Sequence, residues 1–131
     1  MDNYLKYLFS LESKGIKLGL ERTEKLFRIC KNPQKNFPSI QVIGTNGKGS
    51  TSAMIANILK KANYKVGLYT SPHLTKINER IRINGIAIHD SDIIEFINKY
   101  KIGIEKLNVS FFEVMTAIAI WYFDKKNVDL A

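Results

Sequence analysis

Apolar residues recur every three or four positions over several stretches of the chain, a spacing that is typical of amphipathic helices. Outside the central segment, this spacing predicts helices at residues 3–12, 20–29, 90–97 and 111–122. Pro33 limits the second helix, and Asp90 or Ser91 can cap the third. The fourth follows Ser110 and is apolar nearly all round, so we expect it to be buried.

Shorter apolar runs predict strands on either side of a fifth helix. Residues 40–43 and 66–69 read as strands, and between them lie a Gly-rich loop and a helix that ends near residue 62. Such a unit implies parallel strands with a right-handed connection. Residues 79–88 alternate around Asn84-Gly85, which predicts a hairpin, and residues 128–131 begin a further strand-like run. The sequence therefore predicts the α/β class, with a P-loop-type parallel sheet flanked by helices.

The loop after the first predicted strand reads Gly44-Thr-Asn-Gly-Lys-Gly-Ser50. Glycines let a backbone approach a polyphosphate closely, and the amides at a helix N-terminus attract anions. The loop departs from the G-x-x-x-x-G-K-[ST] pattern, because Val42 stands where its first glycine would be and Gly49 follows Lys48. A flexible turn with an exposed lysine is the alternative. The order of strand, loop and helix favours nucleotide binding, and ATP is the expected ligand.

Residues 45–50 and 70–74 both follow a predicted strand. Ligands of parallel sheets lie beyond the carboxyl ends of the strands, so we expect these two loops at one edge of the sheet.

Composition narrows the possible classes of function. The chain has 131 residues, of which 45% are hydrophobic and 24% charged, as in one globular domain. It has no apolar run long enough to span a bilayer and no secretory pattern, and its one cysteine, Cys30, cannot form an internal disulfide. We therefore expect a cytoplasmic protein without a membrane partner. The net charge of +8 suits ATP or nucleic acid, but the lysines are scattered and motifs for nucleic acid are absent, so no nucleic-acid partner is expected.

Several ordered phrases carry a resemblance to a known family: the Gly-rich loop, Leu18-Gly-Leu-Glu-Arg22, Thr70-Ser-Pro-His-Leu74, Glu79-Arg-Ile-Arg82 and Ser110-Phe-Phe-Glu113. Over essentially all its residues, the chain resembles the bifunctional dihydrofolate synthase/folylpolyglutamate synthase family of the Mur ligase superfamily. The resemblance implies that ATP phosphorylates a dihydropteroate or folate carboxylate, and that the amino group of L-glutamate attacks the acyl phosphate. It also implies ATP and Mg²⁺ as cofactors and a monomeric full-length protein.

The resemblance assigns the nucleotide and metal contacts. Those to ATP fall on Thr45, Asn46, Gly47, Lys48, Gly49 and Ser50. Lys48 is the expected catalytic residue, because its charge would offset that of the moving phosphoryl group. Ser71 matches the serine that coordinates Mg²⁺ in the family. Walker-type reasoning alone would choose Ser50, and a turn serine before Pro72 is the bland alternative for Ser71.

Two further segments match the family's pterin and folate contacts, and their residues are Ile16, Lys17, Leu18, Ser110, Phe111, Phe112 and Glu113. An aromatic pair can stack on a flat heterocycle, and a carboxylate can accept its N–H groups. The alternative for the second segment is a helix start with phenylalanine in the core and the acid near the positive end of the dipole. Lys17 could instead be a solvated loop residue.

The family's two-domain organisation sets the expectation for the whole chain. Residues 1–131 match a truncated N-terminal part of a Mur-ligase-like ATP-binding domain, and the C-terminal glutamate ligase domain is absent from the sequence. We therefore expect little ligase activity from the chain alone. The alternative is a catalytically inactive fragment that only binds nucleotide or a partner.

Overall fold

The computed structural model describes residues 2–15 and 18–131. Its α-helices are α1 (Asn3–Glu12), α2 (Glu21–Ile29), α3 (Lys48–Lys61), α4 (Asp90–Leu107) and α5 (Phe111–Lys125). Its strands are β1 (Gly67–Tyr69), β2 (Ile81–Ile83) and β3 (Ile86–Ala87), and two short 3₁₀ helices are η1 (Pro33–Lys35) and η2 (Ile77–Arg80). The predicted helices are all confirmed, although α4 continues ten residues beyond its predicted end at residue 97. No helix in the described part of the chain is long and apolar enough to cross a membrane.

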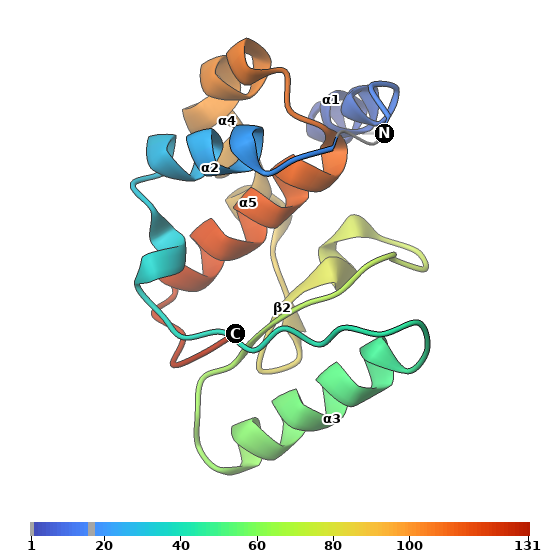
Figure 1. Cartoon of the computed structure of the whole chain (residues 1–131), viewed down its shortest axis with the longest axis vertical. Helices are drawn as coiled ribbons and strands as arrows, with labels where there is room; N and C mark the ends of the chain where they lie inside the picture. The colour runs from blue at the N-terminus through green and yellow to red at the C-terminus, as the bar shows by residue number, and fades with distance from the viewer. Residues whose placement is uncertain (1, 16–17) are drawn as a thin grey trace.

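Helix α5 forms the centre of the core. Its side chains are buried along most of its length, as its almost uniformly apolar sequence predicts, and Ser110 caps it by accepting a hydrogen bond from the amide of Glu113. Helices α1, α2 and α4 pack around it in the upper part of Figure 1. Phe96, Phe123, Leu8 and Leu26 are among the fully buried side chains of this core. The helical layer therefore holds the first turn of α5 in a fixed position.

The hairpin predicted around Asn84-Gly85 is confirmed. Strand β2 pairs antiparallel with β3, and both turn residues have positive φ angles, 49° for Asn84 and 83° for Gly85. Positive φ at both central residues is what a tight type I′ hairpin requires. Strand β2 also pairs antiparallel with β1, so the hairpin extends the sheet on the side away from the Gly-rich loop.

The predicted parallel arrangement is present as a set of backbone contacts between three segments. Val66 and Leu130 form a parallel bridge. On the other side of residues 129–131, the amide of Ala131 donates to the carbonyl of Pro38 at 3.1 Å, and the amide of Ile40 donates to the carbonyl of Ala131 at 2.8 Å. The segment at residues 129–131 therefore lies between the two segments that the sequence pattern joins as one strand–helix–strand unit.

The prediction of a strand at residues 40–43 is wrong, because the structure assigns no strand there. A strand needs a neighbouring backbone along its length, and among residues 40–43 only Ile40 pairs with one, through its hydrogen bond to the carbonyl of Ala131. Within the described residues, no backbone partner is recorded for Gln41 to Ile43. The segment is nevertheless placed by its pairing at Ile40, and it leads directly into the Gly-rich loop.

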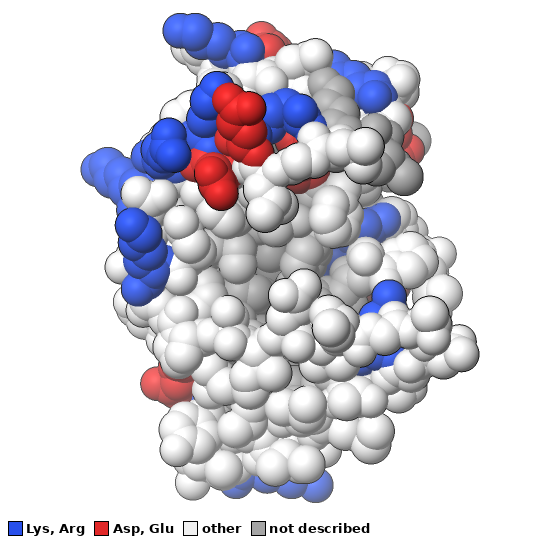
Figure 2. Space-filling view, viewed as in Figure 1, with Lys and Arg blue, Asp and Glu red and all other residues white. Residues whose placement is uncertain are grey.

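Helix α3 lies on one face of this sheet, at the bottom of Figure 1, where it contacts β1. None of its residues is buried, and Met54 and Ile58 are 59% and 67% exposed. Figure 2 shows few charged side chains on this lower part of the molecule, whereas Lys and Arg are dispersed over the upper helices. On the face shown, the basic residues form no single continuous patch, as their scatter in the sequence predicts.

Candidate functional site

The Gly-rich loop ends in the exposed N-terminus of α3. Gly47 caps the helix in the left-handed conformation, with φ of 74°, which side chains other than glycine rarely adopt. The first turn of α3 contains no acidic residue, so no carboxylate offsets the positive end of the helix dipole. Residues 45–47 of the loop and residues 48–50 of the helix are all exposed. Free amides, positive potential and solvent access are the properties that an anion site at a helix start requires.

Lys48 is the first residue of this helix, and its side chain folds back along the loop. A Cβ atom placed on Gly44 would lie 3.8 Å from Cγ of Lys48, so the lysine stem lies beside the first glycine of the phrase. The lysine stem and the amides of the first helical turn therefore belong to one short segment of the chain.

Gly49 has no role in the packing of the chain itself. It is helical, its φ is not in the left-handed range, and a Cβ placed on it would meet nothing within 4 Å. Glycine in a helix is about 0.5–1 kcal/mol less stable than alanine. At Gly49 the backbone is therefore open to close approach by a ligand or by another part of the protein.

The second predicted loop, Thr70–Leu74, emerges on the same side of the molecule as the Gly-rich loop, at the right of Figure 1. Its far end is held by Glu79, whose carboxylate accepts hydrogen bonds from the amides of Leu74, Thr75 and Lys76 at 3.0–3.1 Å. These backbone bonds, led by that from Lys76, lower the pKa of the Glu79 carboxyl. Ser71 is exposed within the loop.

Arg80 joins this loop to the first turn of α5. Its Nε donates to Nδ1 of His73 at 2.8 Å, and its guanidinium lies 5.2 Å from the ring centroid of Phe111. Arg80 is only 8% exposed. His73 therefore acts as a structural acceptor in this loop, and the loop and the aromatic phrase are parts of one packed unit.

The four residues of the phrase Ser110-Phe-Phe-Glu113 differ in their exposure to solvent. Phe111 is buried and stacks on Phe9, with 6.0 Å between ring centroids, whereas Phe112 is 56% exposed. Consecutive helical residues point about 100° apart, so one ring enters the core and the other faces solvent. Phe111 thus follows the core alternative, and Phe112 remains the residue that can stack on a ligand.

The exposed ring of Phe112 lies near the end of β1. Its centroid is 6.5 Å from that of Tyr69, the last residue of the strand, and the Tyr69 hydroxyl hydrogen bonds Oγ1 of Thr116 at 3.2 Å. Burial raises the pKa of the Tyr69 hydroxyl. Because Thr70 and Ser71 follow Tyr69 directly, the aromatic surface and the predicted metal serine are close in the chain.

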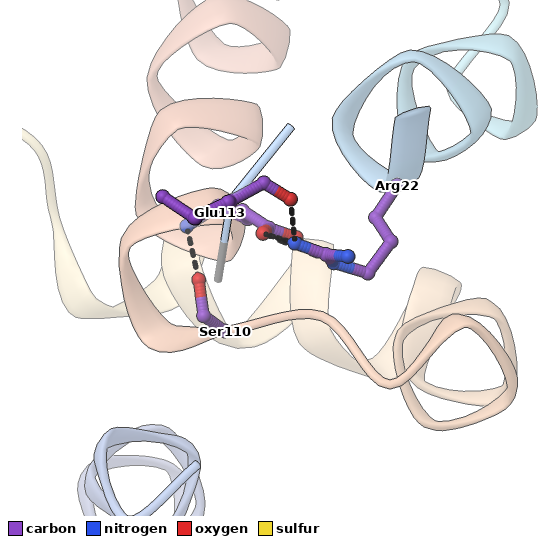
Figure 3. A network of polar contacts seen from close by, with 4 residues as sticks. Arg22, Ser110 and Glu113 are labelled. Carbon is purple, nitrogen blue, oxygen red and sulfur yellow. Dashed lines mark hydrogen bonds and ion pairs between the residues drawn. The ribbon is translucent and has the colours of Figure 1, made fainter. Parts of the chain in front are cut away.

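Glu113 is buried and carries an ion pair rather than an open carboxylate. Figure 3 shows its carboxylate facing the guanidinium of Arg22 on α2. Nε of Arg22 lies 3.2 Å from Oε1 and 3.3 Å from Oε2 of Glu113, and Nη2 lies 3.0 Å from Oε1. Nη2 of Arg22 also donates to the carbonyl of Leu18 at 3.1 Å. Glu113 therefore meets a protein cation in this structure.

No family model matches the chain. The chain is 42% identical over 115 residues to the dihydrofolate synthase/folylpolyglutamate synthase of Bacillus subtilis. The aligned region covers 83% of the chain and 27% of that protein. The chain is 36% identical over 129 residues to the protein of the same name from Escherichia coli. That aligned region covers 98% of the chain and 30% of the E. coli protein.

Solved structures of similar proteins are also synthases of this kind. The folylpolyglutamate synthase of Thermotoga maritima superposes with a TM-score of 0.88 and 41% identity, over 98% of this chain and 32% of that one. The chain belongs to the dihydrofolate synthase/folylpolyglutamate synthase family. It spans somewhat less than a third of the length of the two curated relatives described above. The E. coli enzyme was solved in complex with DHPP and ADP, and it superposes with a TM-score of 0.90 and 34% identity over 98% of the chain and 32% of its own.

The similarity to these synthases does not assign individual site residues, which stay predictions. Residues 45–47 lie in an exposed loop and residues 48–50 in the exposed first turn of α3 that follows it. The loop at residues 70–74, which contains Ser71, lies on the same side of the molecule. Ile16 and Lys17 fall outside the described residues, whereas Leu18 is 90% exposed. Sequence reasoning missed Arg22 and Arg80, because their partners lie 91 and 7 residues away and no local pattern marks the pairing.

Two serines, Ser50 and Ser71, could provide a hydroxyl to Mg²⁺, and both are exposed. The described residues contain no cluster of three or more His, Cys, Asp or Glu side chains that could hold a metal. Mg²⁺ commonly takes one or two protein ligands together with waters and phosphate oxygens, so a serine beside a phosphate loop fits this ion.

Proposed function

We propose that the chain forms the phosphate-binding and acceptor-binding part of a cytoplasmic, monomeric ATP-dependent ligase that adds L-glutamate to dihydropteroate or folate. The observation that carries the proposal is the exposed N-terminus of α3, where Gly47 and Gly49 leave the backbone open and Lys48 adds positive charge. The synthase relatives with bound ADP or an ATP analogue support it. The complete reaction belongs to the whole protein, with residues 1–131 as part of its N-terminal ATP-binding domain.

In the proposed reaction, an oxygen of the acceptor carboxylate attacks the γ-phosphorus of ATP, and ADP leaves. The glutamate nitrogen then attacks the acyl carbon, loses a proton and displaces phosphate. Lys48 and the amides of α3 hold the triphosphate and offset the charge that spreads over its oxygens in transfer. Bound Mg²⁺ supplies further neutralisation of that charge, and Ser71 or Ser50 would hold it.

The acceptor lies against the side of the molecule where Phe112 is exposed beside Tyr69. A flat pterin can stack on this exposed ring, while the buried Phe111 supports the turn from below. A similar structure, an FPGS that was solved in complex with AMPPCP and folate, supports a combined nucleotide and folate site. Leu18 and Ser110 complete the acceptor segments in this proposal.

The test is a titration of Mg²⁺ and AMPPCP into the ¹⁵N-labelled chain, followed by amide NMR shifts. We expect shifts at residues 44–51, and we expect Lys48→Ala to weaken binding by at least about tenfold, because a hydrogen bond to a charged group contributes about 1.5–3 kcal/mol. Lys61→Ala, at the other end of the same helix, is the matched control and should bind like wild type. An unresponsive wild-type chain, or a Lys48→Ala chain with unchanged affinity, contradicts the proposal.

A further inference from the structure

Arg22 makes a connection that the proposed reaction does not use directly. It lies in the first turn of α2, and its guanidinium contacts both oxygens of Glu113 in the first turn of α5. The same Nη2 donates to the carbonyl of Leu18, four residues earlier in the chain. One side chain thus ties the segment before α2 to the start of the core helix (Figure 3).

The burial and charge of this contact constrain the orientation of the two side chains. The Glu113 side chain is 7% exposed and that of Arg22 is 27% exposed, so the pair is partly withdrawn from water. A guanidinium that faces both oxygens of a carboxylate fixes orientation as well as distance. Removing one partner leaves the other as a buried charge without compensation, which is strongly destabilising.

Stability alone does not explain why an ion pair stands here. Well-packed apolar side chains of similar volume often stabilise a core as well as a buried ion pair does, or better. An ion pair with defined geometry also fixes the relative positions of the backbone segments that its side chains contact. Here these segments are the one that ends in the carbonyl of Leu18 and the capped first turn of α5 at Ser110 and Glu113.

Both ends of this connection adjoin exposed apolar side chains. Leu18 is 90% exposed, and Phe112, beside Glu113 in the sequence, is 56% exposed. A flexible lysine could neutralise Glu113, but its single ammonium cannot contact both carboxylate oxygens and the Leu18 carbonyl in the same planar arrangement. The arginine therefore sets where the Leu18 backbone lies relative to the helix that displays Phe112.

We infer that Arg22 is a positioning residue for the folate or pteroate acceptor, holding the segment at Leu18–Leu20 in register with the exposed ring of Phe112. The inference rests on the proposed function, since it assumes that the acceptor lies against these segments. Arg22 itself contacts no substrate in this role. It acts through the Leu18 carbonyl and through Glu113.

The test measures folate and Mg²⁺–AMPPCP binding separately on the ¹⁵N-labelled chain, for wild type, Arg22→Ala and Arg22→Lys. The matched control is Lys25→Ala, which removes an exposed ion pair with Glu21 on the same helix. We expect both Arg22 variants to bind folate at least about tenfold more weakly, because the Leu18 backbone is no longer held opposite Phe112, and to bind AMPPCP within about twofold of wild type. The amides of Gly19 and Leu20 should exchange with solvent faster in these variants, and Lys25→Ala should change none of the three readouts.

Arg22→Lys keeps the test valid if Arg22→Ala does not fold, because it retains the positive charge opposite Glu113. A purely structural role predicts that folate and AMPPCP binding fall together with the folded fraction, and that result overturns the inference. Unchanged folate affinity in folded Arg22→Lys overturns it as well, while leaving the proposed function standing. A wild-type chain that binds AMPPCP but not folate, or neither, refutes the acceptor site itself, and the inference falls with it.

Discussion

The substitution Gly49→Ala should have opposite effects on the stability of the fold and on binding of the proposed nucleotide. Gly49 is the second residue of α3, and a Cβ placed there meets nothing within 4 Å and requires no strained backbone. Alanine should therefore raise the free energy of unfolding by about 0.5–1 kcal/mol, the usual difference in helix stability between the two residues. For a chain of this size, the gain corresponds to a rise in Tm of roughly 2–4 °C.

The same methyl group should harm nucleotide binding. It projects from the first turn of α3, where a phosphate would contact the backbone amides directly, and close approach there is what glycine permits. We expect Mg²⁺–AMPPCP to bind at least about tenfold more weakly, a change of about 1.4 kcal/mol. A more stable protein that binds its ligand less well is the signature of a glycine retained for function.

Stability is measured by urea denaturation followed through the fluorescence of Trp121, which is 8% exposed and should report loss of the core. Binding is measured by amide NMR titration of the folded variant. Gly67→Ala is the matched control for the chemical change, because its Cβ would lie 2.6 Å from the ring of the buried Phe123. That variant should lose about 1–3 kcal/mol through overpacking. If Gly49→Ala binds AMPPCP like wild type, the backbone there is not part of a phosphate cradle.

Two further predictions concern pH. Burial raises the pKa of the Cys30 thiol to about 12, so the folded chain should react very slowly with a thiol reagent at pH 8, and the chain in denaturant should react fast. The neutral thiol contributes to the free energy of unfolding fully below its ordinary pKa of 9.0, and this stabilisation should be lost as pH rises from 9 toward 12. Fast labelling of the folded protein at pH 8 would contradict the burial of Cys30. Backbone hydrogen bonds lower the pKa of Glu79, so the order of the loop at residues 74–76 should persist above the ordinary value of 4.5 and be lost only as pH falls through the lower folded value. Amide shifts of those residues should titrate with a midpoint below 4.5, and Glu79→Gln should abolish that titration; a midpoint at or above 4.5 would refute the assignment.

The elements that the sequence predicts well are those with local causes. Helix α5 follows from its apolar composition and from the Ser110 cap, and the β2–β3 hairpin follows from Asn84-Gly85. Both depend on residues within a few positions of one another. The loop at residues 44–50 is likewise local, because glycines, a lysine and a helix start are adjacent in the sequence.

The elements that it predicts poorly depend on distant partners. Residues 40–43 have the composition of a strand, but strand formation needs a neighbouring backbone, and pairing with Ala131 reaches only Ile40. For Ser110–Glu113, the predicted helix start places Phe111 and Phe112 about 100° apart around the helix axis, and one ring lies in the core while the other faces solvent. The pairing of Glu113 with Arg22 carries no local signal, and only the packing of α2 on α5 brings the two together.

The buried charges of the described core show where geometry matters more than burial. Asp92, on α4, is buried and pairs at 3.0 Å with Lys125, the last residue of α5. Glu95, also on α4, contacts the same ammonium from the exposed side. A flexible lysine suffices there, because that contact only fastens α4 to α5. At the first turn of α5, by contrast, both cations are arginines, and each ties a separate segment to the helix: Arg22 the backbone at Leu18, and Arg80 the loop at His73. Planar, rigid cations at this end and a flexible one at the other are what we expect if only the first turn of α5 must hold neighbouring segments at fixed positions for a ligand.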